Sequence, residues 1–226
     1  MTDRLLLTVQ HTGTWFFITY LRKAANIRFT FEKNVTQNLH QHVLDDPRLR
    51  KVPASSELAK EKVEARLPHL SSLVLERKTF IPLRDPVTSL ITREKRYWKY
   101  DHSFVIHSLA WLASLDGLPN VMIRPGVDFH RDYEQRVQLL NEVARHWEVD
   151  VSPLATEKYA ESWAPVRSTK TEFPHLSNEL DEVYKNEGFE GIRKVLPTEC
   201  ELLLNTPSIK ELFIRYGYDL PWFNAI

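Results

Sequence analysis

Short apolar runs alternate with longer stretches of helical periodicity along this chain, and this alternation constrains the fold more than any other feature. The runs read RLLLTV, NIRFTF, LHQHVL, TFIPL and NVMIR, at residues 4–9, 26–31, 39–44, 79–83 and 120–124. The first is a short apolar run with no helical spacing, and the second alternates between apolar and polar residues. Strands that alternate with helices predict an α/β fold, with a mostly parallel sheet flanked by helices on both faces.

The stretches between these runs carry helix formers and helix boundaries. Asp85 followed by Pro86 is a typical helix start, and Gly117 and Gly217 are typical helix ends. The stretch 150–176 shows neither pattern, and we predict that it is irregular. We predict helices over residues 15–25, 56–67, 86–96, 104–115, 130–147, 178–186 and 208–216.

The composition predicts one globular domain spanning residues 1–226. Of the 226 residues, 42% are hydrophobic and 27% are charged, which is ordinary for a globular protein. One cysteine, Cys200, excludes an internal disulfide framework. The 30 basic and 30 acidic residues give no bulk attraction to nucleic acid or to an anionic membrane. No apolar run approaches the ~18 residues of a membrane span, so we expect a cytoplasmic protein.

A small-residue turn follows the first apolar run and leads into the first expected helix. It reads Gln10-His11-Thr12-Gly13-Thr14, followed by Trp15. Backbone N–H groups at a helix start form a ready anion site, and the hydroxyls of Thr12 and Thr14 add donors. The turn lacks the Gly-Lys-Ser/Thr ending of a Walker A loop and two glycines of a dinucleotide fingerprint. Taken alone, it favours an ordinary strand–helix turn.

A second segment, TFIPLRDPVTSLIT at residues 79–92, strengthens the anion-site interpretation. A strand ends in Arg84-Asp85-Pro86, and a hydroxyl residue, Thr92, follows eight positions after the arginine. An arginine fork is a good phosphate ligand, since charge-assisted hydrogen bonds contribute roughly 1.5–3 kcal/mol each. A salt bridge between Arg84 and Asp85 is the structural alternative.

Together the two segments resemble the sulfotransferases that use 3′-phosphoadenosine 5′-phosphosulfate (PAPS). In that family a strand–loop–helix holds the 5′-phosphosulfate, and an Arg-Asp-Pro with a Ser or Thr eight residues after the Arg holds the 3′-phosphate. The resemblance implies a P-loop-like sulfotransferase architecture and PAPS as co-substrate. Arg84 and Thr92 would bind the 3′-phosphate, and the residues that would bind the phosphosulfate are His11, Thr12, Gly13, Thr14 and Trp15.

The resemblance also implies a reaction, the transfer of a sulfuryl group to a hydroxyl or amine of a carbohydrate or small molecule, without a metal. His11 stands where the family has Lys or Arg, and nearby phosphates favour the charged form of a histidine. The acceptor must lose a proton to a base. His40 and His42, on one face of an expected strand, are the candidates, with Glu32 and His69 as alternatives.

Two other functions remain open. A divergent ATP-dependent kinase needs a loop lysine and a magnesium carboxylate, neither of which stands out. A non-catalytic nucleotide-binding or interaction protein with the same fold would keep both segments without turnover.

Overall fold

The computed structural model describes residues 4–9, 14–25, 29–31, 39–43, 60–61, 64–97, 102–126, 132–163 and 174–220. The chain divides into two compact units. The first unit comprises Met1–Val43, Leu67–Arg84 and Asp116–Val166. The second comprises Leu44–Arg66, Asp85–Leu115 and Arg167–Ile226.

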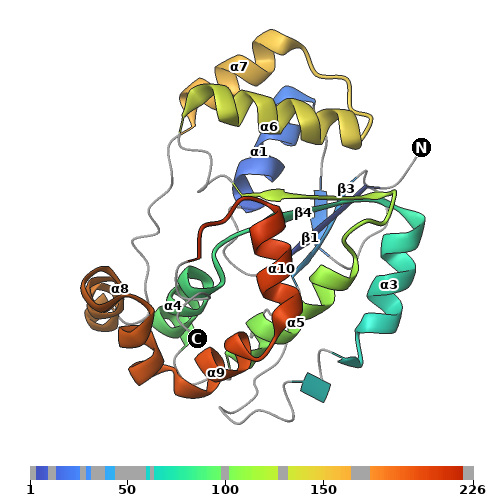
Figure 1. Cartoon of the computed structure of the whole chain (residues 1–226). Coiled ribbons are helices and arrows are strands. Elements are labelled where there is room, and N and C mark those ends of the chain that lie inside the picture. Colours follow the sequence, from blue (N-terminus) through green and yellow to red (C-terminus); the bar gives the residue numbers. More distant parts are fainter. Residues whose placement is uncertain are drawn as a thin grey trace. The chain divides into compact units, whose positions relative to one another are not determined.

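A parallel sheet forms the centre of the first unit (Figure 1). Its strands lie in the order β2-β3-β1-β4-β5, and every printed pair is parallel. All five predicted strands are confirmed, with ends that shift by at most three residues. The strands are β1 (Arg4–Thr8), β2 (Phe29–Phe31), β3 (Leu39–Val43), β4 (Lys78–Leu83) and β5 (Val121–Pro125).

Strand β1 is buried on both faces, which explains its unbroken apolar sequence. Leu5, Leu6 and Leu7 are all fully buried, although successive side chains of a strand point to opposite faces. Leu6 belongs to the main core of the first unit, where it joins Phe80 of β4. The mixed α/β class with a parallel sheet is therefore confirmed.

Four helices complete the described part of the first unit. They are α1 (Thr14–Ala24), α3 (Leu67–Glu76), α6 (Tyr133–His146) and α7 (Pro153–Ser162). Helices α1, α6 and α7 contribute aromatic and aliphatic side chains to the same core, including Phe17, Tyr159 and Leu140. The predicted helices over 15–25 and 130–147 are confirmed by α1 and α6.

Helix α7 corrects the prediction that 150–176 is irregular. The Ser152 side chain accepts a hydrogen bond from the Ala155 N–H at 3.1 Å, and Pro153 occupies the first turn. The Tyr159 hydroxyl donates to the Phe16 carbonyl at 2.7 Å, so α7 is tied to α1. This tertiary bond has no signature in the local sequence.

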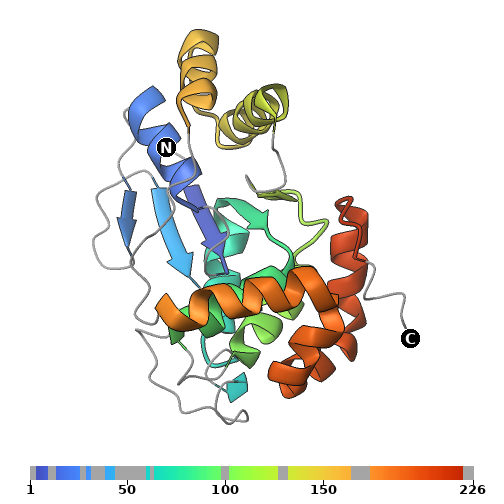
Figure 2. The ribbon, with the colours of Figure 1, turned by 90° about the vertical axis from the view of Figure 1, so that its left-hand side faces the viewer.

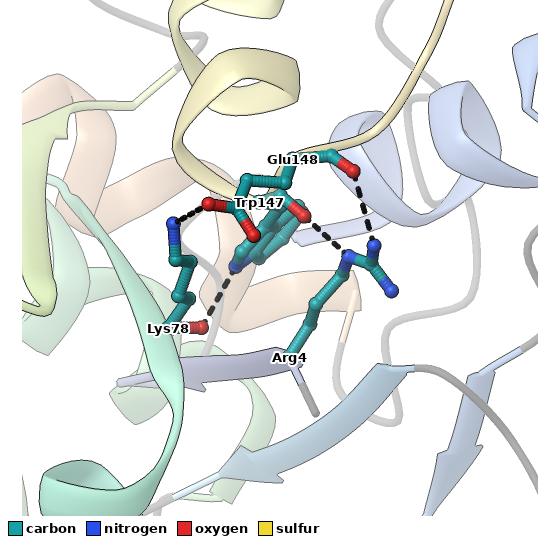
Figure 3. A network of polar contacts seen from close by, with 4 residues as sticks. All are labelled: Arg4, Lys78, Trp147 and Glu148. Carbon is teal, nitrogen blue, oxygen red and sulfur yellow. Dashed lines mark hydrogen bonds and ion pairs between the residues drawn. The ribbon is translucent and has the colours of Figure 1, made fainter. Parts of the chain in front are cut away.

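A polar network joins the end of α6 to the first residues of β1 and β4 (Figure 3). Arg4 donates from Nε to the Trp147 carbonyl at 2.6 Å and from Nη2 to the Glu148 carbonyl at 3.3 Å. The Trp147 indole donates to the Lys78 carbonyl at 3.0 Å, and the Lys78 ammonium lies 2.6 Å from the Glu148 carboxylate. We call these four residues the amino-edge network, because they meet where both strands begin.

Five helices form the described part of the second unit, apart from short turns. They are α4 (Pro86–Tyr97), α5 (Ser103–Ser114), α8 (Pro174–Val195), α9 (Pro197–Leu204) and α10 (Pro207–Arg215). Helix α8 packs against α4 and α9, and α5 packs against α9 and α10. In Figure 2 the orange ribbon of α8 leads into the red α9 and α10.

Helix α8 contains a sharp break at Gly188. Its backbone has φ 63° and ψ −147°, a combination that favours glycine. A Cβ on Gly191 would lie 2.6 Å from a methyl of Val183, so the next turn needs a second glycine. The prediction of a helix over 178–186 is confirmed and extended. The predicted helix over 56–67 lies mostly outside the described residues.

Candidate functional site

The two segments predicted to bind an anion follow neighbouring strands. Strands β1 and β4 are adjacent and parallel, with Arg4 opposite Lys78 and Leu6 opposite Phe80. Their carboxyl ends, Thr8 and Leu83, therefore meet at the same edge of the sheet. We call this the carboxyl edge.

The strand order gives this edge a further property. After β1 the chain adds β2 and β3 on one side, and it then crosses to add β4 on the other side. This reversal is a topological switch point, and in open parallel sheets ligands bind outside the carboxyl ends of the strands at such a point.

The first segment leads from β1 into α1. His11, Thr12 and Gly13 lie outside the described residues, as do the side chains of Thr14 and Trp15. The backbone of α1 begins at Thr14. The first N–H groups of a helix have no partner within the helix and lie at the positive end of its dipole, so this start favours a negative ligand.

The second segment begins where β4 ends. Arg84 directly follows Leu83, whose carbonyl accepts a hydrogen bond from the Gly126 N–H at 2.6 Å. This bond extends the pairing of β4 with β5 to the base of the Arg84 side chain. Arg84 is partly exposed, as a ligand-binding side chain requires.

Asp85 opens helix α4, as the sequence predicts. Its Oδ1 accepts a hydrogen bond from the Thr88 N–H at 3.0 Å, and Pro86 takes the first helical position. The Tyr184 hydroxyl, from α8, also donates to this carboxylate. Burial raises the pKa of Tyr184, and together with the charge of Asp85 and this hydrogen bond brings it to about 12.

Thr92 lies on the second turn of α4 and is partly buried. Its hydroxyl donates to the Thr88 carbonyl at 2.8 Å, a bond within the helix that a stronger acceptor can replace by rotation of the hydroxyl. Arg84 belongs to the first unit and Thr92 to the second.

The candidate bases occupy different levels of the sheet. His40 lies opposite Leu5 of β1, and His42 lies opposite Leu7. Since a strand rises about 3.3 Å per residue, His42 is about 7 Å nearer the carboxyl edge. Glu32 lies outside the described residues, and His69 is exposed on α3.

A buried polar cluster that no sequence motif indicated follows Thr92. Arg93 is 1% exposed, and its Nε donates to Nδ1 of His102 at 3.2 Å. The other ring nitrogen of His102 contacts the Glu94 carboxylate, and the Arg93 guanidinium lies 5.7 Å from the centre of the Phe104 ring. These contacts tie the last turns of α4 to the start of α5.

The described residues contain no group of three side chains arranged to hold a metal ion. Across the same part of the chain, no helix combines the length and the apolar character needed to cross a bilayer. No protein-family model, curated protein or solved structure matches this chain.

Proposed function

We propose that the protein is a PAPS-dependent sulfotransferase with a P-loop-like architecture. One observation carries the proposal: the phosphosulfate-like turn and the Arg84 segment follow the adjacent parallel strands β1 and β4. A nucleotide with phosphates at both its 5′ and 3′ positions needs two anion sites at one edge of a sheet. The topological switch point between β1 and β4 supports such a pair of sites.

The proposed roles follow from the chemistry of each group. Residues His11 to Thr14, with Trp15, bind the 5′-phosphosulfate through N–H and hydroxyl donors at the start of α1. Arg84 binds the 3′-phosphate through its guanidinium, and Thr92 adds a hydroxyl. His11 supplies positive charge to the bridging oxygen as it becomes the leaving group.

In the proposed reaction the acceptor hydroxyl attacks the sulfur atom of PAPS. A new S–O bond forms, the bond from sulfur to the phosphate oxygen breaks, and adenosine 3′,5′-bisphosphate leaves. His42, nearer the carboxyl edge than His40, takes the proton of the acceptor. The acceptor is a carbohydrate or small molecule, and no residue role requires a metal.

Calorimetric titration with adenosine 3′,5′-bisphosphate, ATP and AMP tests the proposal. We expect micromolar binding of the bisphosphate and much weaker binding of the other two. Arg84→Ala should abolish this preference. Arg22→Ala removes the same charge from an exposed position in the last turn of α1, and it should leave the preference intact.

The other outcomes distinguish the alternatives. Preference for ATP would replace the proposal with a kinase, and no nucleotide binding would replace it with an interaction protein. Preferential binding of the bisphosphate without transfer from PAPS to any of a panel of hydroxyl and amine acceptors would indicate a non-catalytic relative. His11→Lys should retain transfer activity if the charge at that position is what matters.

A further inference from the structure

Helices α6 and α7 lie side by side in the first unit (Figure 1) and form a groove between them. The Arg136 guanidinium donates from Nε to the Ala160 carbonyl at 3.3 Å, and the side chains of Asp132 and Ser152 cap the two helices. The groove has a volume of about 380 Å³, within the range of ligand-binding sites. Because both helices are anchored, this groove exists before anything binds in it.

Four residues that line the groove form a straight polar stripe along α6. They are Glu134, Gln138, Asn141 and Arg145, which follow one another at steps of four, three and four positions. Such steps keep side chains on one face of a helix, and they are also the spacing by which two helices pair side by side. The polar stripe therefore carries an acid at one end, two amides in the middle and a base at the other end, about 16 Å away.

The charged ends of the polar stripe make no ion pair within the described part of the chain. No other described residue pairs with the carboxylate of Glu134 or with the guanidinium of Arg145. Glu142, three positions before Arg145, is held by Arg124 at 2.8 Å and by Gln138 at 3.1 Å. A partner that brings the opposite charge to each end would therefore gain attraction at both ends.

The acidic end of the groove suits a guanidinium. Glu157 of α7 lines the groove together with Glu134, and Tyr133 adds an aromatic ring that is 37% exposed. Desolvation raises the pKa of Tyr133, and the charges of both carboxylates raise it further. A guanidinium can donate to two carboxylates and stack on an aromatic ring, which an ammonium group does less well.

The polar stripe is complementary to a second copy of itself in the opposite direction. Glu134 then lies opposite the partner's Arg145, and Gln138 lies opposite the partner's Asn141. A two-fold axis repeats each of these pairs, because in such an interface residue i meets j and j meets i. We propose that the α6–α7 groove is the interface of a homodimer in which two copies of α6 pair antiparallel about a two-fold axis. Each acidic end receives the Arg145 guanidinium of the other copy.

Charge reversal at either end of the polar stripe tests the proposal. Glu134→Arg places two bases opposite each other at both ends of the interface, and Arg145→Glu places two acids there. Sedimentation equilibrium over micromolar to millimolar concentrations should show reversible dimers of the wild type. Each reversal should raise the dimer Kd about tenfold or more, since two exposed ion pairs are lost and two repulsions are gained.

An equimolar mixture of the two variants should recover the association. In the mixed dimer one chain has a base at each end of the stripe and the other has an acid at each end, so both pairs attract again. Neither variant alone should associate as strongly. Each reversal also opposes the dipole of α6 and lowers the melting temperature slightly, but mixing cannot repair such a loss within a chain.

Glu179→Arg and Lys185→Glu are the matched controls. They make the same changes of charge at exposed positions of α8. The dimer Kd of each control should equal that of the wild type, and mixing the two controls should change nothing.

A cross-linking measurement tests the pairing without a change of charge. A mixture of Gln138→Cys and Asn141→Cys, treated with oxidised glutathione, should form disulfide-linked dimers faster than either variant alone, because these positions meet across the axis. The native Cys200 is fully buried and does not compete.

Three results would overturn the inference: a wild-type protein that is monomeric at every concentration, association that both reversals leave unchanged, or a loss that mixing does not recover. A monomeric wild type would assign the groove to a partner of other chemistry. These measurements need no nucleotide, so their outcome is independent of the proposed function.

Discussion

The two ends of the adjacent strands β1 and β4 are built differently. At the amino edge, Arg4 donates to the Trp147 and Glu148 carbonyls, and the Trp147 indole donates to the carbonyl of Lys78. The N–H donors of Arg4 and Trp147 are thus used in hydrogen bonds within the protein. At the carboxyl edge, the same two strands lead to the start of α1 and to Arg84.

This difference separates two uses of an arginine at a strand end. Arg4 holds the last turn of α6 on the sheet, so its donors contribute to stability. Arg84 stands at the switch point, where a parallel sheet binds its ligands. The comparison predicts that amino-edge substitutions change stability and that carboxyl-edge substitutions change binding.

Trp147→Ala should have the largest effect on stability. Trp147 is fully buried, packs edge-on against Phe80 and donates to the Lys78 carbonyl. Its truncation leaves a cavity and an unpaired carbonyl, for which we expect a loss of about 3–5 kcal/mol in the free energy of unfolding. Urea denaturation measures this loss. At a temperature where the variant is folded, the bisphosphate Kd should be unchanged, and a weakened Kd would contradict the separation of the two edges.

Arg4→Met and Arg84→Met form a matched pair at opposite ends of neighbouring strands. Methionine keeps most of the aliphatic length and removes the charge and the donors. Arg4→Met should lower the free energy of unfolding by about 1.5–3 kcal/mol, since it removes charge-assisted hydrogen bonds to two carbonyls. Its bisphosphate Kd should match the wild type.

Arg84→Met should show the reverse pattern. The bisphosphate Kd should rise roughly 10- to 100-fold, whereas that of Arg4→Met should not change. Denaturation gives the free energy of unfolding of each variant, and calorimetry gives the bisphosphate Kd of each. The separation fails if Arg84→Met destabilises the fold as much as Arg4→Met does.

The sheet could be predicted from the sequence because its signal is local. Residues buried on both faces of β1 produce a continuous apolar run, and the segment 26–31 was recognised by its alternation of apolar and polar residues. Helix α7 was missed because its sequence has weak apolar periodicity. Its anchor, the bond from Tyr159 to Phe16, spans 143 positions.

In the candidate site, too, features with a local sequence signal could be predicted and contacts between distant segments could not. Asp85 as a helix cap and Arg84 at a strand end were predictable, since each depends on its immediate neighbours. The contact of Tyr184 with Asp85 and the burial of Arg93 beside His102 were not, because helix packing creates them. The adjacency of β1 and β4 likewise required the strand order.

The amino edge should also carry a modest dependence of stability on pH. Burial lowers the pKa of His146 below its usual 6.5 despite a hydrogen bond to the Thr79 carbonyl, and the charges of Lys78 and Arg124 lower it further. The unfolded chain therefore binds this proton at a higher pH than the folded chain. The neutral His146 side chain therefore contributes its full share to stability above about pH 6.5. This stabilisation is lost as the pH falls through the pKa of His146 in the folded chain.

His146→Gln tests this contribution, since glutamine keeps an N–H donor and does not titrate. We expect the melting temperature of the variant to fall less than that of the wild type between about pH 7.5 and pH 5.5. Identical pH profiles would assign the acid sensitivity to other groups. Glu142 acts only at lower pH, because burial raises its pKa but hydrogen bonds from Arg124 and Gln138 lower it overall below 4.5.

Substitutions of Glu148 should have the smallest effect on stability. They distinguish the contribution of its backbone strain from that of its charge at the amino edge. Its φ of 51° lies in the left-handed region, which costs a side-chain-bearing residue energy and suits glycine. Its exposed carboxylate pairs with Lys78, and such exposed pairs contribute little. Glu148→Ala and Glu148→Gly both remove the carboxylate, but glycine alone relieves the backbone.

We therefore expect Glu148→Gly to melt a few degrees above Glu148→Ala, with both near the wild type. Raising the salt concentration should lower the melting temperature of the wild type slightly more than that of either variant. A glycine variant that melts below the alanine variant would mean that the left-handed backbone is not strained.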